Sequence, residues 1–207
     1  MRFLYTSIKT VFIAVSSMAK FEKITEKLHK TLNEHRFFHT LGVSFTAQSL
    51  AMKYGADIKK AGIAGLLHDC AKAYKSDELL KMCEDYSIPI KDVEREFPAL
   101  LHAKVGAYLA KTEYGVTDEE ILDAIVCHTT GKPGMNTLEK VIYVADFIEP
   151  GRYKMNNLEA IRKMAFTDLD ETLLMILSAT VDYLNETMNE GIDPFTIETY
   201  EYYKKNK

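Results

Sequence analysis

The sequence of 207 residues lacks the signatures of several large classes of protein. It contains no P-loop, no G-x-G-x-x-G fingerprint, and no serine, histidine and aspartate in the order of a nucleophilic-serine triad. No window reaches the roughly 18 uninterrupted apolar residues that a membrane-spanning helix needs. Sustained apolar–polar alternation and Asn-Gly turns are also missing, which argues against a β-sheet. Walker-type chemistry, serine nucleophiles and membrane spans therefore have no support.

Cysteine is scarce. The three residues Cys70, Cys83 and Cys127 are odd in number, lack C-x-x-C spacing and lie in segments that are predicted to be helical. This usage indicates reduced thiols in a cytosol. The net charge of -4 argues against a surface built for the phosphate backbone of nucleic acids. A local basic pocket for one small anion is still compatible with that charge.

The first 17 residues do not fit the pattern of the rest. They combine Arg2 with an apolar stretch that Lys9 interrupts, and the run from Ser17 to Ala19 resembles a signal-peptide cleavage site. Met18 and the following AKFEKITEKLHKTL resemble a natural protein start. We therefore expect residues 1–17 to be an extension from a start codon assigned too early, with secretion as the alternative. Residues 18–207 would form the domain, and the protein would be cytoplasmic.

Apolar residues recur at helical spacing from residue 21 onward, first as the apolar face Phe21, Ile24, Leu28 and Leu32. Two later helices begin with capping-box patterns, because Thr117 stands three residues before Glu120 and Asn136 stands three residues before Glu139. No repeat or Pro/Gly/Ser linker divides the chain, and 47% of its residues are hydrophobic. We therefore predict one all-α domain of about eight to ten helices.

Further helix boundaries are indicated by single residues. Helices are expected to end near Gly115, Gly131 and Gly191. Another helix is expected to begin at Asn156 or Asn157. The aromatic residues Tyr200, Tyr202 and Tyr203, at the end of the chain, are predicted to cover an edge of the core.

Four of the six histidines are candidates for a buried site. His29 and His35 have charged and polar neighbours and are expected to face solvent, whereas the other four have apolar or small neighbours: His39, His68, His102 and His128. One such histidine is usually a hydrogen-bonded core residue. Asp69 follows the apolar run of GLLHDCAK and Asp146 interrupts VIYVADFIEP, and a buried carboxylate needs a cation or several donors. Together these six residues indicate a metal site.

The spacing of these residues supports one common site. The intervals between successive members of the order H, HD, H, H, D are 29, 33, 26 and 18 residues, and each corresponds to one helix-turn-helix step. Side chains that project inward from successive helices of a bundle can meet at one point. Imidazole and carboxylate ligands suit iron, manganese, zinc or nickel rather than calcium or magnesium alone. The spacing does not choose among these metals.

This order resembles that of the HD-domain metal-dependent phosphohydrolases. The segments EHRFFHTLGV, GLLHDCAK and ILDAIVCHTTGKPGMNTLEKVIYVADFIEPGR are similar to the YqeK branch, the symmetrical diadenosine-tetraphosphate hydrolases. The likeness runs from about Met18 to near the C-terminus. The HD doublet is a weak motif, but HTTGKPGM followed by LEKVIYVADFIEPGR is long and specific. The first 17 residues depart from the pattern of this branch.

The resemblance implies a single HD-domain helical bundle with a central metal site. It implies a divalent metal, iron in this branch, with the ligands His39, His68, Asp69 and Asp146. His102 and His128 match positions that meet the nucleotide phosphates in this branch and that bind a second metal ion in other HD enzymes. Both alternatives stay open.

Several residues beside the motifs are expected to bind the substrate. Thr129, Thr130 and Gly131 stand where a helix opens into a loop, so that their hydroxyls and amides can donate to phosphate oxygens. Gly42, which has no side chain, would let a nucleotide approach closely. The cations nearest the motifs are Arg36, Lys72, Lys132 and Arg152, of which we assign Lys72 and, most strongly, Arg152 to the substrate.

The implied reaction is the symmetrical hydrolysis of diadenosine tetraphosphate to two ADP. A metal would bind phosphoryl oxygen and lower the pKa of its water, and the metal-bound hydroxide would attack an inner phosphorus. As catalytic residues, Asp69 would orient the water, and His102 or His128, when protonated, would neutralise developing charge. The expected partner is this small nucleotide, without nucleic acid or membrane, and a homodimer stays open.

Three alternatives remain at this stage. Another HD-type nucleotidase would use the same metal ligands with a different pocket, although the flanking segments argue against it. A metal-stabilised nucleotide-binding module would bind without turnover. An HD-type di-iron oxygenase would consume dioxygen.

A chain that begins at Met18 is expected to fold, bind metal and hydrolyse substrate as well as the full chain, because the helical pattern begins only near Phe21. Circular dichroism and activity of the two purified proteins check this expectation. An insoluble shortened protein would show instead that apolar residues such as Phe12 and Ile13 complete the core.

Overall fold

The structure is a computed structural model that describes residues 19–153, 155, 157–187 and 193–206. Within these residues the chain forms eleven α-helices and two 3₁₀ helices and no strand. The all-α prediction is confirmed. The helix count is slightly above the expected range because helices such as α5 (Asp92–Glu96), with five residues, are too short to show a period in the sequence. The expected extension, residues 1–17, lies outside the described residues.

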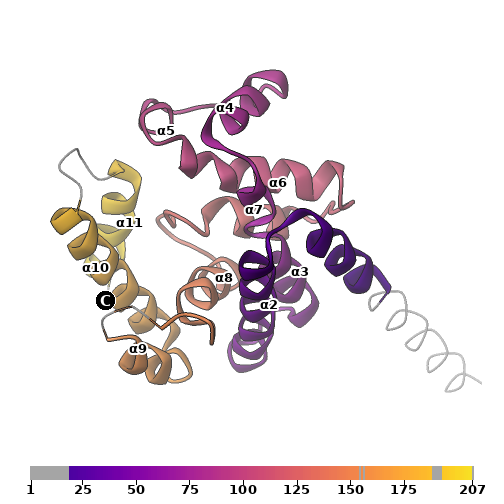
Figure 1. Cartoon of the computed structure of the whole chain (residues 1–207). Coiled ribbons are helices and arrows are strands. Elements are labelled where there is room, and N and C mark those ends of the chain that lie inside the picture. Colours follow the sequence, from indigo (N-terminus) through magenta and orange to yellow (C-terminus); the bar gives the residue numbers. More distant parts are fainter. Residues whose placement is uncertain (1–18, 154, 156, 188–192, 207) are drawn as a thin grey trace, which may run out of the picture.

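The helices follow one another with short connections (Figure 1). The first described helix covers residues 19–31. The others are α2 (Glu34–Tyr54), α3 (Ile58–Leu67), η1 (Cys70–Ala73), α4 (Ser76–Asp85), α5, η2 (Pro98–Leu101), α6 (His102–Thr112), α7 (Glu119–Cys127), α8 (Thr137–Ile148), α9 (Leu158–Ala165), α10 (Leu169–Thr187) and α11 (Pro194–Lys205).

Four helices form the centre of the bundle. α2 packs against α3 and α8, and α7 also packs against both α3 and α8. On one side of this centre α6 and η1 pack together, and α6 also packs on α7. On the other side α10 contacts α8, α9 and α11, so that the C-terminal helices form a separate group in Figure 1. The elements that carry the six predicted site residues are therefore neighbours.

The helix caps agree only in part with the sequence patterns. Asn136 and Glu139 form the predicted capping box of α8, in which each side chain accepts a hydrogen bond from the other residue's backbone N–H. The predicted cap at Thr117 is wrong, because Asp118 is the N-cap of α7 and accepts from the N–H of Glu120 at 3.1 Å. Asp118 also pairs with Lys60 of α3, a contact that sequence spacing does not reveal.

Other predicted boundaries hold with changed details. Gly131 has φ +67° and donates its N–H to the carbonyl of Cys127, the last residue of α7. Asn157 precedes α9 in the left-handed conformation and its side chain caps no described N–H. Gly115 follows the end of α6 by three residues with φ +62°, whereas Gly191 and Asn156 lie outside the described residues.

The C-terminal tyrosines cover the core edge to different degrees. The hydroxyl of Tyr203, a buried residue, accepts a hydrogen bond from the backbone N–H of Met135 at 2.7 Å. Tyr200 is partly buried against the core, and Tyr202 is exposed. The prediction therefore holds for two of the three residues.

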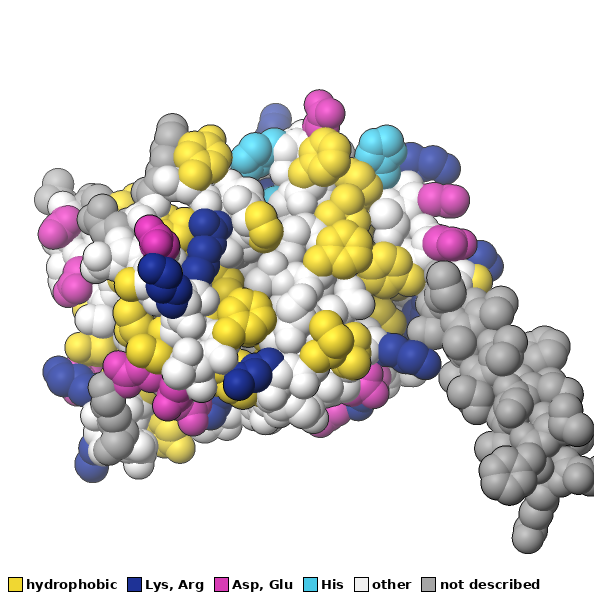
Figure 2. Space-filling view, turned by 90° about the horizontal axis from the view of Figure 1, so that it is seen from below, with side chains coloured by type: hydrophobic (Ala, Val, Ile, Leu, Met, Phe, Trp, Pro, Cys, Tyr) yellow, Lys and Arg dark blue, Asp and Glu magenta, His cyan; other side chains and the backbone are white. Residues whose placement is uncertain are grey.

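The outward face of α2 is apolar. Phe38, Phe45 and Met52, which are spaced by seven residues, are each more than half exposed. Figure 2 shows one face of the molecule on which hydrophobic side chains (yellow) gather, with some charged side chains among and around them. None of the described helices is long and apolar enough to cross a membrane.

The approach of α2 and α3 depends on a glycine. A Cβ added at Gly65 of α3 would lie 2.7 Å from the Cα of Ser44 in α2. The Ser44 hydroxyl donates to the carbonyl of Gly62 at 2.8 Å, and this bond fastens the two helices together. Because a backbone atom cannot move aside as a side chain can, Gly65 sets the distance between the helices.

Gly65→Ala is therefore expected to lower the free energy of unfolding by about 1–3 kcal/mol, the usual cost of overpacking a core. An alanine in an ordinary helix interior would instead raise stability by about 0.5–1 kcal/mol. Gly62→Ala is the matched control, because the three atoms nearest to its Cβ would all belong to the side chain of Gln48. Denaturant unfolding measures both variants, and equal stability of the two would contradict the steric interpretation.

Candidate metal centre

The structure brings the six predicted residues to one place. His39 lies in α2, His68 follows the end of α3, and Asp69 precedes η1. The other three are His102 at the start of α6, His128 after the end of α7, and Asp146 in α8. All are buried except Asp146, which is partly buried. The exposed positions predicted for His29 and His35 are also confirmed.

Three of the imidazoles have a fixed orientation. The Nδ1 atoms of His68, His102 and His128 lie 2.7, 2.5 and 2.7 Å from the carbonyl oxygens of residues 65, 99 and 125. A carbonyl oxygen only accepts, so each Nδ1 carries the proton and each neutral ring keeps a lone pair on Nε2. The Nε2 atoms all point into the cluster.

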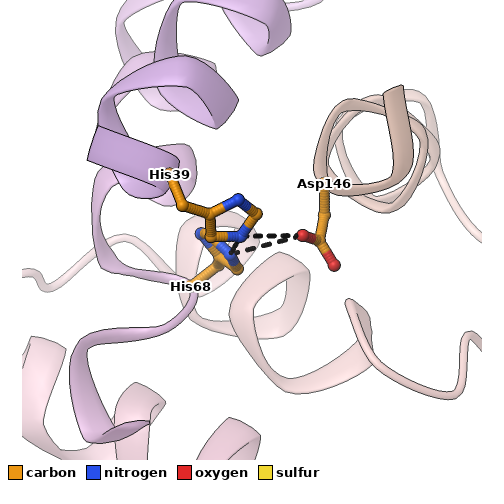
Figure 3. A group of neighbouring side chains, drawn as sticks. All are labelled: His39, His68 and Asp146. Atoms are coloured by element: carbon orange, nitrogen blue, oxygen red, sulfur yellow. Dashed lines mark hydrogen bonds and ion pairs between the residues drawn. The ribbon is translucent and has the colours of Figure 1, made fainter. Parts of the chain in front are cut away.

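The first part of the cluster is formed by His39, His68 and Asp146 (Figure 3). The two Nε2 atoms are 3.3 Å apart, and the Asp146 Oδ1 atom lies 3.0 Å from that of His39 and 3.7 Å from that of His68. The Asp69 Oδ2 atom is 3.8 and 3.5 Å from the same two nitrogens. Lone pairs and carboxylates that converge in this way fit a divalent transition metal, which these donors prefer.

The second part of the cluster shares Asp69. Its Oδ1 atom lies 3.3 Å from the Nε2 of His102 and 3.5 Å from that of His128, and these two nitrogens are 3.1 Å apart. The Thr129 hydroxyl is 3.3 and 3.2 Å from the same nitrogens. His68, Asp69 and His128 also offer ligand atoms within 4.8 Å of one another. This geometry suits either phosphate contacts or a second ion.

Burial and charge set the protonation states of the cluster. Burial lowers the pKa of His68 to about 4 and also lowers the pKa of His102. Burial acts in the same direction on His128, but hydrogen bonding to Asp69 and the charge of Asp146 outweigh it and raise its pKa. The neighbouring imidazoles hold the pKa values of both aspartates below the usual range despite burial. Ionised carboxylates and a neutral His68 are the forms that bind metals.

Two arginines contact the aspartates. Arg36 Nη1 lies 2.5 Å from Asp69 Oδ2, and Arg152 Nη2 lies 2.7 Å from Asp146 Oδ1. The sequence assigned Arg152 to the site but not Arg36. The helical spacing could have indicated Arg36, because it lies three residues before His39 and therefore on the same side of α2.

Two cavities adjoin the cluster. A cavity of about 280 Å³ is lined by Asp69, Lys72, His102 and His128 among others. A larger one of about 1160 Å³ is lined by aromatic residues that include Phe38, Phe147 and Tyr153. Both cavities share the lining residues Arg36, Phe147, Arg152 and Thr180. The His/Asp cluster therefore borders both a small polar cavity and a larger, more apolar one, with His39 among the residues that line the larger cavity.

Three residues of the loop after α7, Thr129, Thr130 and Gly131, were expected to face phosphate, but they do not all line the cavity at the cluster. Thr129 lines the small cavity, but Thr130 and Gly131 line a separate cavity of about 230 Å³ and not the one at the cluster. The Gly131 N–H is already bound to the carbonyl of Cys127. Lys132 instead pairs with Glu139 at 2.6 Å.

Gly42 was predicted to leave room for a nucleotide, but a side chain of the protein lies next to it. It lines the larger cavity, but a Cβ at Gly42 would lie 2.5 Å from the Oε2 atom of Glu149. The space over Gly42 is thus taken by a carboxylate of this chain. Glu149 was missed by the sequence analysis, although it is an acidic residue directly after the helix that carries Asp146.

Comparison with known proteins gives consistent matches. The HD domain family matches residues 36–151. The symmetrical bis(5'-nucleosyl)-tetraphosphatase of Bacillus subtilis (strain 168) is 46% identical over 171 residues, which cover 83% of this chain and 90% of that protein. The protein of the same name from Staphylococcus aureus is 38% identical over 165 residues, which cover 79% and 84%.

A solved structure has the same fold. The crystal structure of a predicted HD superfamily hydrolase involved in NAD metabolism from Clostridium acetobutylicum matches with a TM-score of 0.86 and 40% identity. The match covers 90% of this chain and 98% of that one. These findings confirm the resemblance seen in the sequence motifs. The chain therefore belongs to the HD-domain family of metal-dependent phosphohydrolases.

Proposed function

We propose that this protein hydrolyses dinucleoside polyphosphates and cleaves diadenosine tetraphosphate symmetrically to two ADP. The observation that carries the proposal is the likeness to the Bacillus subtilis enzyme over 90% of that enzyme's length. The site supports it, because a cluster of metal ligands faces a polar cavity that adjoins a larger aromatic one. The three free, buried cysteines are compatible with the cytoplasm, where we place this activity.

The proposed metal is iron, with the ligands His39, His68, Asp69 and Asp146. When bound, a divalent metal supplies positive charge that polarises phosphoryl oxygens and acidifies coordinated water. The side chain of Asp69 contributes acceptor oxygens to both parts of the cluster, so it can orient the attacking water by accepting its hydrogen bond.

The cations and donors of the small cavity are assigned to the polyphosphate. The guanidinium groups of Arg36 and Arg152 present several N–H donors in a plane that matches phosphate oxygens. Lys72 and Thr129 line the same cavity and supply an ammonium group and a hydroxyl. His102 and His128 complete the lining and are assigned to phosphate contact in their protonated forms, in which Nε2 also carries a proton to donate. One nucleoside would occupy the larger cavity.

The proposed step is a hydrolysis in which water attacks one of the two inner phosphorus atoms. The bond from that phosphorus to the central bridging oxygen breaks, and the bridging oxygen leaves with the other ADP. The oxygen of water remains on the first ADP, and the two protons of water pass to solvent or to the product phosphates. One oxygen from water is therefore incorporated for every two ADP formed.

Product analysis on diadenosine tetraphosphate in ¹⁸O-labelled water tests the function. ADP alone, with one label for every two molecules, supports the proposal. ATP with AMP would mean asymmetrical cleavage, and an absence of products would favour a binding module. Turnover of a deoxynucleoside monophosphate, with diadenosine tetraphosphate left intact, would favour another HD-type nucleotidase.

Asp146→Ala is expected to lower bound metal and hydrolysis together, because Asp146 Oδ1 is close to two imidazole nitrogens of the proposed ligand set. Elemental analysis and activity measure the two effects. Asp170→Ala, which removes an exposed carboxylate that pairs with Lys140, is the control and should leave both unchanged. Full metal content and full activity in Asp146→Ala would remove this residue from the site.

His102→Ala and His128→Ala are expected to keep the metal content and to lose roughly ten- to a hundredfold in kcat/KM. This loss corresponds to a charge-assisted hydrogen bond of about 1.5–3 kcal/mol to phosphate. Elemental analysis and steady-state kinetics of both variants check this outcome. A fall from two metal ions to one per chain would assign the two histidines to a second ion instead.

A further inference from the structure

The carboxylate of Glu149 is buried against the cluster without being one of the proposed ligands. The residue is 3% exposed, and its Oε1 atom lies 3.1 Å from Nδ1 of His39. Its Oε2 atom accepts a hydrogen bond from the backbone N–H of Gly151 at 2.6 Å. Both oxygens therefore have a partner, and the Nδ1 atom faces the carboxylate on the side of the ring that lies away from the cluster.

Two glycines leave a slot for this carboxylate. A Cβ at Gly42 would lie 2.5 Å from Oε2, and a Cβ at Gly151 would lie 2.9 Å from both oxygens. No larger residue fits at either position unless the carboxylate moves. The position of Glu149 is thus defined by close packing as well as by hydrogen bonds.

The backbone around Glu149 is held by a third residue. Arg162 of α9 donates to the carbonyls of Ile148, Glu149 and Arg152 at 2.9, 2.7 and 2.8 Å. These carbonyls belong to the end of α8 and the turn that follows it. The turn therefore has little freedom to carry the Glu149 side chain away from His39.

His39 needs this partner more than the other histidines do. The other three donate Nδ1–H to carbonyls at helix ends, whereas His39 lies inside α2, where the backbone carbonyls are engaged in helical hydrogen bonds. Asp146 Oδ1 lies 3.0 Å from Nε2 of His39 and would accept a proton placed there. A ring with Nε2–H would hydrogen-bond to Asp146 and would have no lone pair on Nε2, the nitrogen that faces the cluster.

We propose that Glu149 is a positioning residue that holds the Nδ1–H tautomer of His39 and so presents the Nε2 lone pair to the metal. The inference rests on the metal-ligand role of His39 in the proposed function, and not on the identity of the substrate. Partners of this kind, which bind the second nitrogen of a ligating histidine, fix the tautomer and the ring orientation.

Glu149→Gln separates tautomer control from simple filling of space. The carboxylate accepts from two donors, the Nδ1–H of His39 and the N–H of Gly151, whereas a carboxamide has one acceptor oxygen. The Gly151 N–H is fixed in the turn, so the amide oxygen should stay with it. The amide NH₂ then faces His39, which favours a lone pair on Nδ1 and a proton on Nε2.

The first measurement is ¹⁵N NMR of the imidazole rings in the metal-free full-length protein. The His39 signal is identified by its loss in His39→Asn. We expect Nδ1–H in the wild-type protein and Nε2–H in Glu149→Gln. The second measurement is calorimetric titration with Zn²⁺, and with Fe²⁺ under anaerobic conditions, in which Glu149→Gln should bind about ten- to a hundredfold more weakly.

Three further variants distinguish the positioning role from a general loss of structure. Glu139→Gln changes an equally buried carboxylate that serves the capping box of α8, and it should leave the His39 tautomer and metal affinity unchanged. Gly42→Ala keeps the Glu149 carboxylate but displaces it, and should weaken metal binding in the same direction. Gly62→Ala is its matched control, because Gly62 is also helical and the three atoms nearest to its Cβ would all belong to the side chain of Gln48.

The double variant Gly42→Ala with Glu149→Gln should bind metal no more weakly than Glu149→Gln alone, because both changes act on one contact. Wild-type metal affinity with retained Nδ1–H in Glu149→Gln would overturn the proposal. Should that variant fail to fold, unchanged metal affinity in Gly42→Ala would overturn it equally. Weaker metal binding in these variants, beside a wild-type protein that makes no ADP, would support the positioning role and reject only the proposed substrate.

Discussion

The structure depends on two carboxylates that share one small space, the buried Asp69 and the partly buried Asp146. Removing an ionised carboxylate from water costs several kcal/mol unless opposite charges and hydrogen bonds replace the solvent. Here each aspartate has its own arginine, and four imidazoles surround the pair. The surrounding groups hold both carboxyl pKa values low, so the site keeps two negative charges inside the protein. A divalent cation is the ligand that such a site fits best.

The same hydrogen bonds that orient the site also complete the helices around it. The last carbonyls of an α-helix have no partner within the helix. His68 and His128 follow the ends of α3 and α7, and each donates Nδ1–H to a carbonyl in the last turn, at residues 65 and 125. One bond thus satisfies a helix end and fixes the tautomer of a histidine. This double use applies to His68 and His128, whereas His39 lies inside α2 and has a side-chain partner instead.

The sequence contains enough information to predict the helical fold and the six residues of the cluster. Histidines and aspartates with apolar neighbours, spaced by the length of one helix-turn-helix step, are typical of a metal site in a helical bundle. The helical periodicity predicts that they lie on the inner faces of their helices. Contacts across the fold could not be predicted in the same way. Glu149 is 110 residues from His39, and no local pattern shows that its carboxylate fills the space above Gly42. An arginine among polar neighbours, such as Arg36, is usually a surface residue. Only the folded structure shows that its guanidinium group contacts Asp69.

The two cavities explain how an acidic protein can bind a polyanion. The net charge is -4, yet Arg36, Lys72 and Arg152 all line the small cavity beside the cluster. Both arginines also line the larger cavity, so positive charge lies at the border where a nucleoside would join its phosphates.

Under the proposed function, the position of this border relative to the cluster determines which phosphoanhydride bond is cleaved. A nucleoside held in the larger cavity fixes how many phosphates extend toward the cluster, and symmetrical cleavage requires that the second phosphorus from the ribose lies over it. The distance between the aromatic cavity and the cluster, rather than recognition of the leaving half, would then determine which bond breaks.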